Sequence, residues 1–156
     1  NNNSQQVQVN EPEMANDETQ IKEFSVLFIM LNYFHIVSKK IEELSEISFL
    51  SEKNESLKKL IIASILEGFD QDKIKSKISI DYKKLIDEIQ ENSSIQIILK
   101  KKDNEAILEL LNELIAELKE LNNLKKIESL EKKLINNLDE NSYSELIKLK
   151  SQINRE

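Results

Sequence analysis

The sequence predicts an all-α protein, a compact bundle of about six helices followed by a C-terminal two-helix hairpin arm. Two observations lead to this class. The 156 residues include one glycine and one proline, which leaves almost none of the turn chemistry that β-hairpins and β-sandwiches need. Apolar residues recur three or four positions apart through most of the chain, and this is the spacing of one face of a helix.

Composition and charge argue against several function classes. The net charge of −7 disfavours a broad grip on phosphate backbones, so little direct nucleic-acid binding is expected. The absence of cysteine rules out disulfides and cysteine-based metal sites. The longest apolar run, Val26–Leu31, is far shorter than the roughly 18 residues that indicate a membrane span, so no membrane contact is expected.

The N-terminal segment, residues 1–16, is polar, low in complexity and holds the only proline. This composition predicts a disordered tail or interdomain linker. Asp17 and Gln20 have the spacing of a capping box ahead of an apolar run, so the ordered part is expected to begin there. A helical bundle is assigned to residues 17–121.

The first helix of the bundle, Glu18–Tyr33, is apolar on nearly every face and is therefore expected to be the central buried helix. Either Ser51 or Asn54 is expected to cap the third helix, and Gly68 to end it in a left-handed conformation. The next three helices are expected to be capped by Asp70, by Asp81 and by either Ser93 or Ser94. The remaining helices of the bundle are predicted at His35–Leu44, Glu55–Glu67, Gln71–Ile78, Tyr82–Glu91 and Ile95–Lys100.

A long helix, Asn104–Leu138, follows its expected cap at Asp103. After a break at Asp139–Asn141, the last helix is predicted at Ser142–Ile153, with Ser142 and Glu145 as a capping box. The hairpin subdomain is assigned to residues 122–156, with the long helix shared between both parts. The apolar seam steps by threes from Leu118 to Leu130, which predicts either a kink or subdomain junction near Asn122 or a straight helix whose seam slowly rotates.

The residues support no catalytic, metal-binding or cofactor-binding site. His35 is the only histidine, and the single glycine cannot form a phosphate-binding loop. The carboxylates alternate with lysines as on solvated helix faces. An interaction module is therefore expected rather than an enzyme. The lysines at 100–102, together with Lys58, Lys59, Lys83 and Lys84, form either a patch for an acidic peptide or part of a solvated surface.

Four segments, taken in order, resemble the C-terminal helicase-binding domain of bacterial DNA primase, DnaG. The resemblance covers roughly Glu18 to Glu156. The first segment is FSVLFIMLNYFHIVSKKIEEL, an apolar helix running into a short one, and the second is ISFLSEKNESLKKLIIASILEG. The third is the long Glu/Leu/Lys helix from Asn104. The fourth is DENSYSELIKLKSQINRE, similar to the family's chain end.

The resemblance implies a non-catalytic tether. The zinc-binding and polymerase domains of the primase would lie N-terminal to this segment. The segment itself would bind the N-terminal domain of the replicative DnaB-type helicase, as a monomer without cofactors, in the cytoplasm at the replication fork. Matched to the family, the helicase-binding residues would be Tyr143, Leu146, Ile147 and Lys150 of the last helix, with Leu134 and Leu138 of the long helix.

These residues are expected to divide between two roles. The last helix is expected to bury Tyr143, Leu146, Leu149 and Ile153. Leu134, Leu138 and Leu146 would mainly hold the hairpin together, which leaves the exposed flank of Ile147 and Lys150 for the partner.

A second contact follows from the same resemblance. In some relatives the bundle also binds the acidic C-terminal tail of single-stranded-DNA-binding protein through basic residues. The matching segment here offers Lys22, and Lys101 or Lys102 would supply a further contact.

Two alternatives stay open. The helicase's own N-terminal domain has a similar fold and predicts self-association through the hairpin. An unrelated coiled-coil assembly protein predicts a parallel dimer through Asn104–Leu138.

Overall fold

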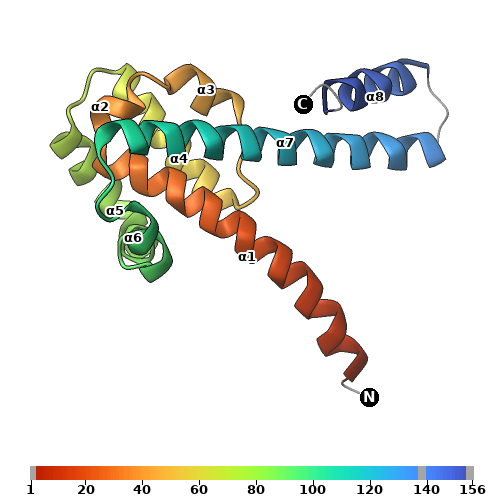
Figure 1. The fold of residues 1–156 in the computed structure, drawn as a ribbon, viewed down its shortest axis with the longest axis horizontal. Helices are drawn as coiled ribbons and strands as arrows, with labels where there is room; N and C mark the ends of the chain where they lie inside the picture. The colour runs from red at the N-terminus through yellow and green to blue at the C-terminus, as the bar shows by residue number, and fades with distance from the viewer. Residues whose placement is uncertain (1–2, 137–139, 154–156) are drawn as a thin grey trace. The chain divides into compact units, whose positions relative to one another are not determined.

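The computed structural model describes residues 3–136 and 140–153, with side chains from Glu18 onward. The all-α prediction is confirmed, since the described residues form eight helices and no strand (Figure 1). These are α1 (Asn3–Asn32), α2 (Phe34–Val37), α3 (Ile41–Glu46), α4 (Glu52–Leu66), α5 (Gln71–Gln90), α6 (Ser93–Leu99), α7 (Asn104–Asn136) and α8 (Glu140–Ile153).

The chain divides into two compact units, and the division falls within α7. Unit 1 is Asn1–Ile115 and unit 2 is Ala116–Glu156. Helix α7 runs without interruption past Asn122, the place where a kink or subdomain junction was one of two expectations. The junction lies instead between Ile115 and Ala116.

Helix α1 is the centre of unit 1. It packs against α2, α4, α5 and α6 (Figure 1), and its second half is buried on nearly every side, as the apolar run predicts. Its buried apolar side chains are Phe24, Val26, Leu27, Ile29, Met30 and Leu31. The first part of α7 adds the buried Ile107 and Leu111 to the core.

The backbone of α1 begins at Asn3, within the segment for which a disordered tail or interdomain linker was predicted. Pro12 lies in this stretch and has no N–H to donate to a helix. The tail or linker assignment of residues 1–16 stays a prediction.

One helix boundary in unit 1 was predicted wrongly. The single helix expected at His35–Leu44 is two, because the chain turns at residues 38–40 and buries Val37 and Leu44 separately. The break expected at Asp81 is present as a kink within α5. Tyr82, the residue after Asp81, leaves the helical region with φ −120° and ψ 16°, so α5 consists of two helical stretches joined at that kink.

Most of the predicted caps are present. The Ser51 hydroxyl accepts the Asn54 N–H at 3.3 Å, Asp70 accepts the Lys73 N–H at 2.8 Å, and Asp103 accepts the Ala106 N–H at 2.8 Å. Gly68 has φ +87°, the left-handed C-terminal cap that was expected. The prediction of Ser93 or Ser94 as a cap is wrong: α6 begins at Ser93, two residues before the predicted start, and is capped by Asn92, whose Oδ1 accepts the Ile95 N–H at 3.2 Å.

Lys58 is a buried charged side chain of unit 1 and is not part of a surface patch. It is 1% exposed. Its ammonium forms an ion pair with Glu55 at 2.9 Å and donates to the carbonyls of Leu44, at 3.1 Å, and of Ile47. These carbonyls lie at the C-terminal end of α3, where the helix has no further backbone N–H groups to pair with them. A cation is therefore favourable at this place.

Glu23 of α1 binds the other end of the same loop. Its carboxylate accepts the N–H groups of Leu50, at 2.6 Å, and Ser51, at 3.4 Å, as well as the Asn54 side-chain amide at 2.9 Å. Leu50 and Ser51 immediately precede α4, where an anion is favourable. The residues between α3 and α4 are thus fixed by a buried cation on one side and a buried carboxylate on the other.

Replacing Lys58 by methionine is expected to lower the free energy of unfolding by about 3 kcal/mol. The substitution keeps the apolar stem but leaves the Glu55 carboxylate and two buried carbonyls without their donor. Urea denaturation followed by circular dichroism measures the change. The matched control is Lys59→Met at the neighbouring exposed position, for which a change under about 0.5 kcal/mol is expected. Equal stability of the two variants would contradict the structural role of Lys58.

Candidate functional site

Unit 2 is a two-helix hairpin with a small apolar core of its own. In Figure 1, α8 runs back along the last part of α7. Ile127 and Leu130 of α7 and Leu146 of α8 form a buried cluster, and three partly buried side chains pack against it: Leu134, Leu149 and Ile153. The structure therefore places Leu134 and Leu146, two of the predicted binding residues, at the contact between the helices. Leu138 lies outside the described residues.

The other predicted residues of α8 face solvent. Tyr143 is 54% exposed and Ile147 is 50% exposed. The expectation that Tyr143 is buried is wrong, because Leu146, Leu149 and Ile153 occupy the inward face of α8. Tyr143, Ile147 and Lys150 are spaced by four and then three residues, so they follow one another along a single face of α8.

Lys150 crosses the hairpin. Its ammonium lies 3.1 Å from a Glu131 carboxylate oxygen of α7, and both side chains are about half exposed. An ion pair at this exposure contributes little to stability. It does show which turns of α7 and α8 lie side by side, since Glu131 is directly across from Lys150.

Ile135 is a further surface residue, which the sequence analysis missed. It is 83% exposed and lies one turn beyond Glu131 on the same face of α7, while Ile147 lies one turn before Lys150 on α8. Because the two helices run in opposite directions, both isoleucines lie on the hairpin-turn side of the ion pair. We define the apolar strip as Ile135, Ile147 and Tyr143. The sequence offered one indication for Ile135: it is an apolar residue next to Leu134 that does not belong to the apolar seam of the long helix.

Helix α8 begins two residues earlier than predicted. Glu140 and Asn141 are already helical, so Ser142 lies inside the helix and is not the cap that the capping-box pattern predicted. Glutamate is a good helix former and favours the first turn of a helix, which explains the earlier start.

The three lysines predicted for an acidic tail lie in unit 1. Lys22 is half-buried on α1, whereas Lys101 and Lys102 are exposed in the turn between α6 and α7. The neighbouring Lys100 lines a hollow of about 290 Å³ together with Phe28, Tyr33, Gln96 and Leu99. The sequence analysis named Lys100 only as part of the basic run and missed the aromatic side chains beside it, because they come from the other end of unit 1's sequence.

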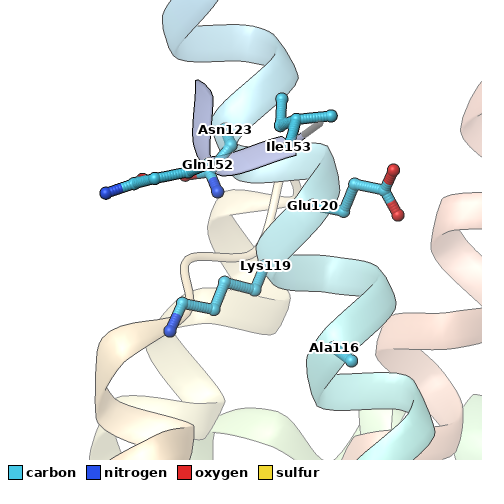
Figure 2. Close-up of a pocket in the computed structure, with 6 residues that line it drawn as sticks. All are labelled: Ala116, Lys119, Glu120, Asn123, Gln152 and Ile153. Carbon is cyan, nitrogen blue, oxygen red and sulfur yellow. The ribbon is translucent and has the colours of Figure 1, made fainter. Parts of the chain in front are cut away.

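A second hollow, of about 400 Å³, lies within unit 2. Figure 2 shows its lining: Ala116, Lys119, Glu120 and Asn123 of α7 with Gln152 and Ile153 at the end of α8. The lining offers one lysine, one carboxylate and two amides. Among the described residues of the lining there is no nucleophile with an adjacent base, the constellation that covalent or acid–base catalysis requires.

Within residues 3–136 and 140–153, no three histidine, aspartate or glutamate side chains gather as a metal site would need. No described helix is both long enough and apolar enough to cross a membrane. His35 is exposed on α2.

Comparison of the chain with protein-family models, with curated proteins and with solved structures finds no match. The resemblance to the primase domain therefore remains a prediction from the quoted segments.

Leu146→Asp is expected to open unit 2 and leave unit 1 folded. Leu146 is 7% exposed in a cluster of three buried side chains. An aspartate there would bury a charge without a partner, which is unfavourable. Hydrogen exchange read by mass spectrometry should show lost protection across residues 116–153 and unchanged protection across 18–110. Ser151→Asp, at an exposed position of the same helix, is the matched control. Loss of protection throughout the chain would contradict the division into two units.

Proposed function

We propose that this chain is a helicase-binding domain of a DNA primase, which tethers primer synthesis to a replicative DnaB-type helicase. In this proposal unit 2 is the docking element and the chain itself catalyses nothing. The primer-synthesising activity would belong to N-terminal domains of the parent protein.

One structural observation supports the proposal beyond the sequence resemblance. The apolar strip exposes Ile135, Ile147 and Tyr143 on a two-helix unit that buries few side chains of its own. A few apolar or aromatic anchors surrounded by polar residues are the usual centre of a protein–protein interface. Lys150 and Glu131 lie at the edge of the strip, where charged residues direct association more than they add affinity.

Size-exclusion chromatography with light scattering tests the proposal against its alternatives. The chain is run alone and mixed with the hexameric helicase from the same source. A monomer that co-elutes with the hexamer supports the tether. A stable ring or dimer that does not co-elute points to the helicase's own N-terminal domain or to a coiled-coil assembly protein.

Ile147→Asp is expected to weaken binding to the helicase at least about tenfold while the hairpin stays folded. The side chain is half exposed, so the substitution adds a charge at the centre of the strip without burying it in the hairpin core. Isothermal titration calorimetry measures the change. Ile80→Asp introduces the same charge at an exposed isoleucine of unit 1 and should leave the affinity unchanged. Equal loss in both variants would argue against docking through the apolar strip.

A second contact is supported by the hollow at Lys100. Its apolar wall of Phe28, Tyr33 and Leu99 beside a lysine suits the end of an acidic chain that carries an apolar side chain. We propose that the predicted tail of single-stranded-DNA-binding protein binds here, with Lys101 and Lys102 close by in the sequence.

A short aspartate-rich peptide with a C-terminal phenylalanine serves as the probe for this contact. Binding should weaken about tenfold in Lys100→Gln, since the variant loses one charged partner of the peptide. Fluorescence anisotropy measures the affinity. Lys84→Gln, at an exposed position of α5, is the control. No difference between the two variants would place the tail elsewhere.

A further inference from the structure

Four lysines gather on one face of α7 in unit 2. Lys125, Lys126, Lys132 and Lys133 are all exposed. They stand at positions i, i+1, i+7 and i+8, which at 3.6 residues per turn places them within about a third of the helix circumference. The α7 residues that contact α8 fall outside this third. We call these four residues the lysine face.

The lysine face presents hydrogen-bond donors and has one glutamate at its edge. Ser129 and Asn136 lie between the lysines on the same face, at i+4 and i+11, and both are exposed. Glu128 stands at the edge, three residues after Lys125 and four before Lys132, whereas Glu131 projects from another side and is engaged by Lys150. Among the described residues, none of the four lysines forms an ion pair.

The distribution of charge between the units matters for what this face can bind. Unit 2 contains eight acidic and eight basic residues and is neutral, so the whole net charge of −7 belongs to unit 1. A polyanion that approaches unit 2 therefore meets no net repulsion from it. The net charge of the chain is an average over two units that differ, so it does not exclude phosphate binding by unit 2.

We propose that the lysine face binds the phosphate backbone of a nucleic-acid duplex without reading its sequence. Lysine, serine and asparagine are typical phosphate-contacting residues. The two lysine pairs are held about 10.5 Å apart along a helix, against a duplex that carries a charge every ~1.7 Å. No apolar anchor lies on the face, as a protein partner would need, and no aromatic side chain is there to stack the bases of a single strand.

This inference does not rest on the proposed function. The apolar strip and the lysine face are different faces of unit 2, so binding to the helicase can fail while binding to the duplex stands. Binding to the duplex can likewise fail while binding to the helicase stands.

Fluorescence anisotropy on the full chain with a labelled duplex of random sequence tests the proposal. Binding is expected at low salt and should weaken with salt, with a slope of log affinity against log salt of about −3.6 for four lysines. The variant with Lys125, Lys126, Lys132 and Lys133 all changed to glutamine should lose it. Each single change should reduce the slope by about one.

The matched control changes four exposed lysines of unit 1 to glutamine, with the same loss of charge. These are Lys53, Lys59, Lys75 and Lys84. Retained duplex binding in this control supports the assignment to the lysine face. No binding to the wild-type chain at low salt, or an equal loss in the control, would overturn it. Tighter binding of an oligothymidylate single strand or of poly-glutamate would also overturn it, in favour of a single strand or an acidic protein.

Discussion

Lys58 and Glu23 hold opposite ends of one short loop, and the path of the chain in unit 1 depends on them. The lysine binds the last carbonyls of α3 and the glutamate binds the amides ahead of α4. Each charge therefore meets the end of a helix that favours its sign. Because Glu23 comes from the central helix α1, the network also fixes α4 against the core. Both charges are buried, so neither can be removed alone without leaving polar groups unpaired.

Unit 2 is built on a different principle. It has no buried ionic network among the described residues, and its cohesion comes from an apolar cluster contributed by two helices. Much of its surface therefore faces solvent. Three features lie on that surface: the apolar strip, the Glu131–Lys150 ion pair and the lysine face. Unit 1 carries the negative charge and most of the buried core. The two proposals for unit 2 use separate surfaces of the same small element.

The sequence predicted the fold class and most caps because these depend on local patterns. Apolar spacing identified the helices. Short-range chemistry alone identified Asp70, Gly68 and Asp103, and it gave Ser51 as one of two candidate caps. The errors have long-range causes. Lys58 was grouped with surface lysines, although it stands on the inward stripe with Leu57 and Ile61; its burial depends on carbonyls of another helix. The hollow at Lys100 joins residues as far apart in the sequence as Phe28 and Lys100. Ile135 could have been found as an apolar residue outside the seam.

The small core of unit 2 has a consequence for any partner that recognises the closed hairpin. Three clustered buried side chains supply little free energy beyond the cost of ordering the helices, so we expect the hairpin to open at a lower free-energy cost than the bundle does. The observed dissociation constant then equals the intrinsic one divided by the closed fraction. Substitutions at the Leu130–Leu146 contact would thus change the affinity without contacting the partner. A bound partner would in turn stabilise the closed hairpin.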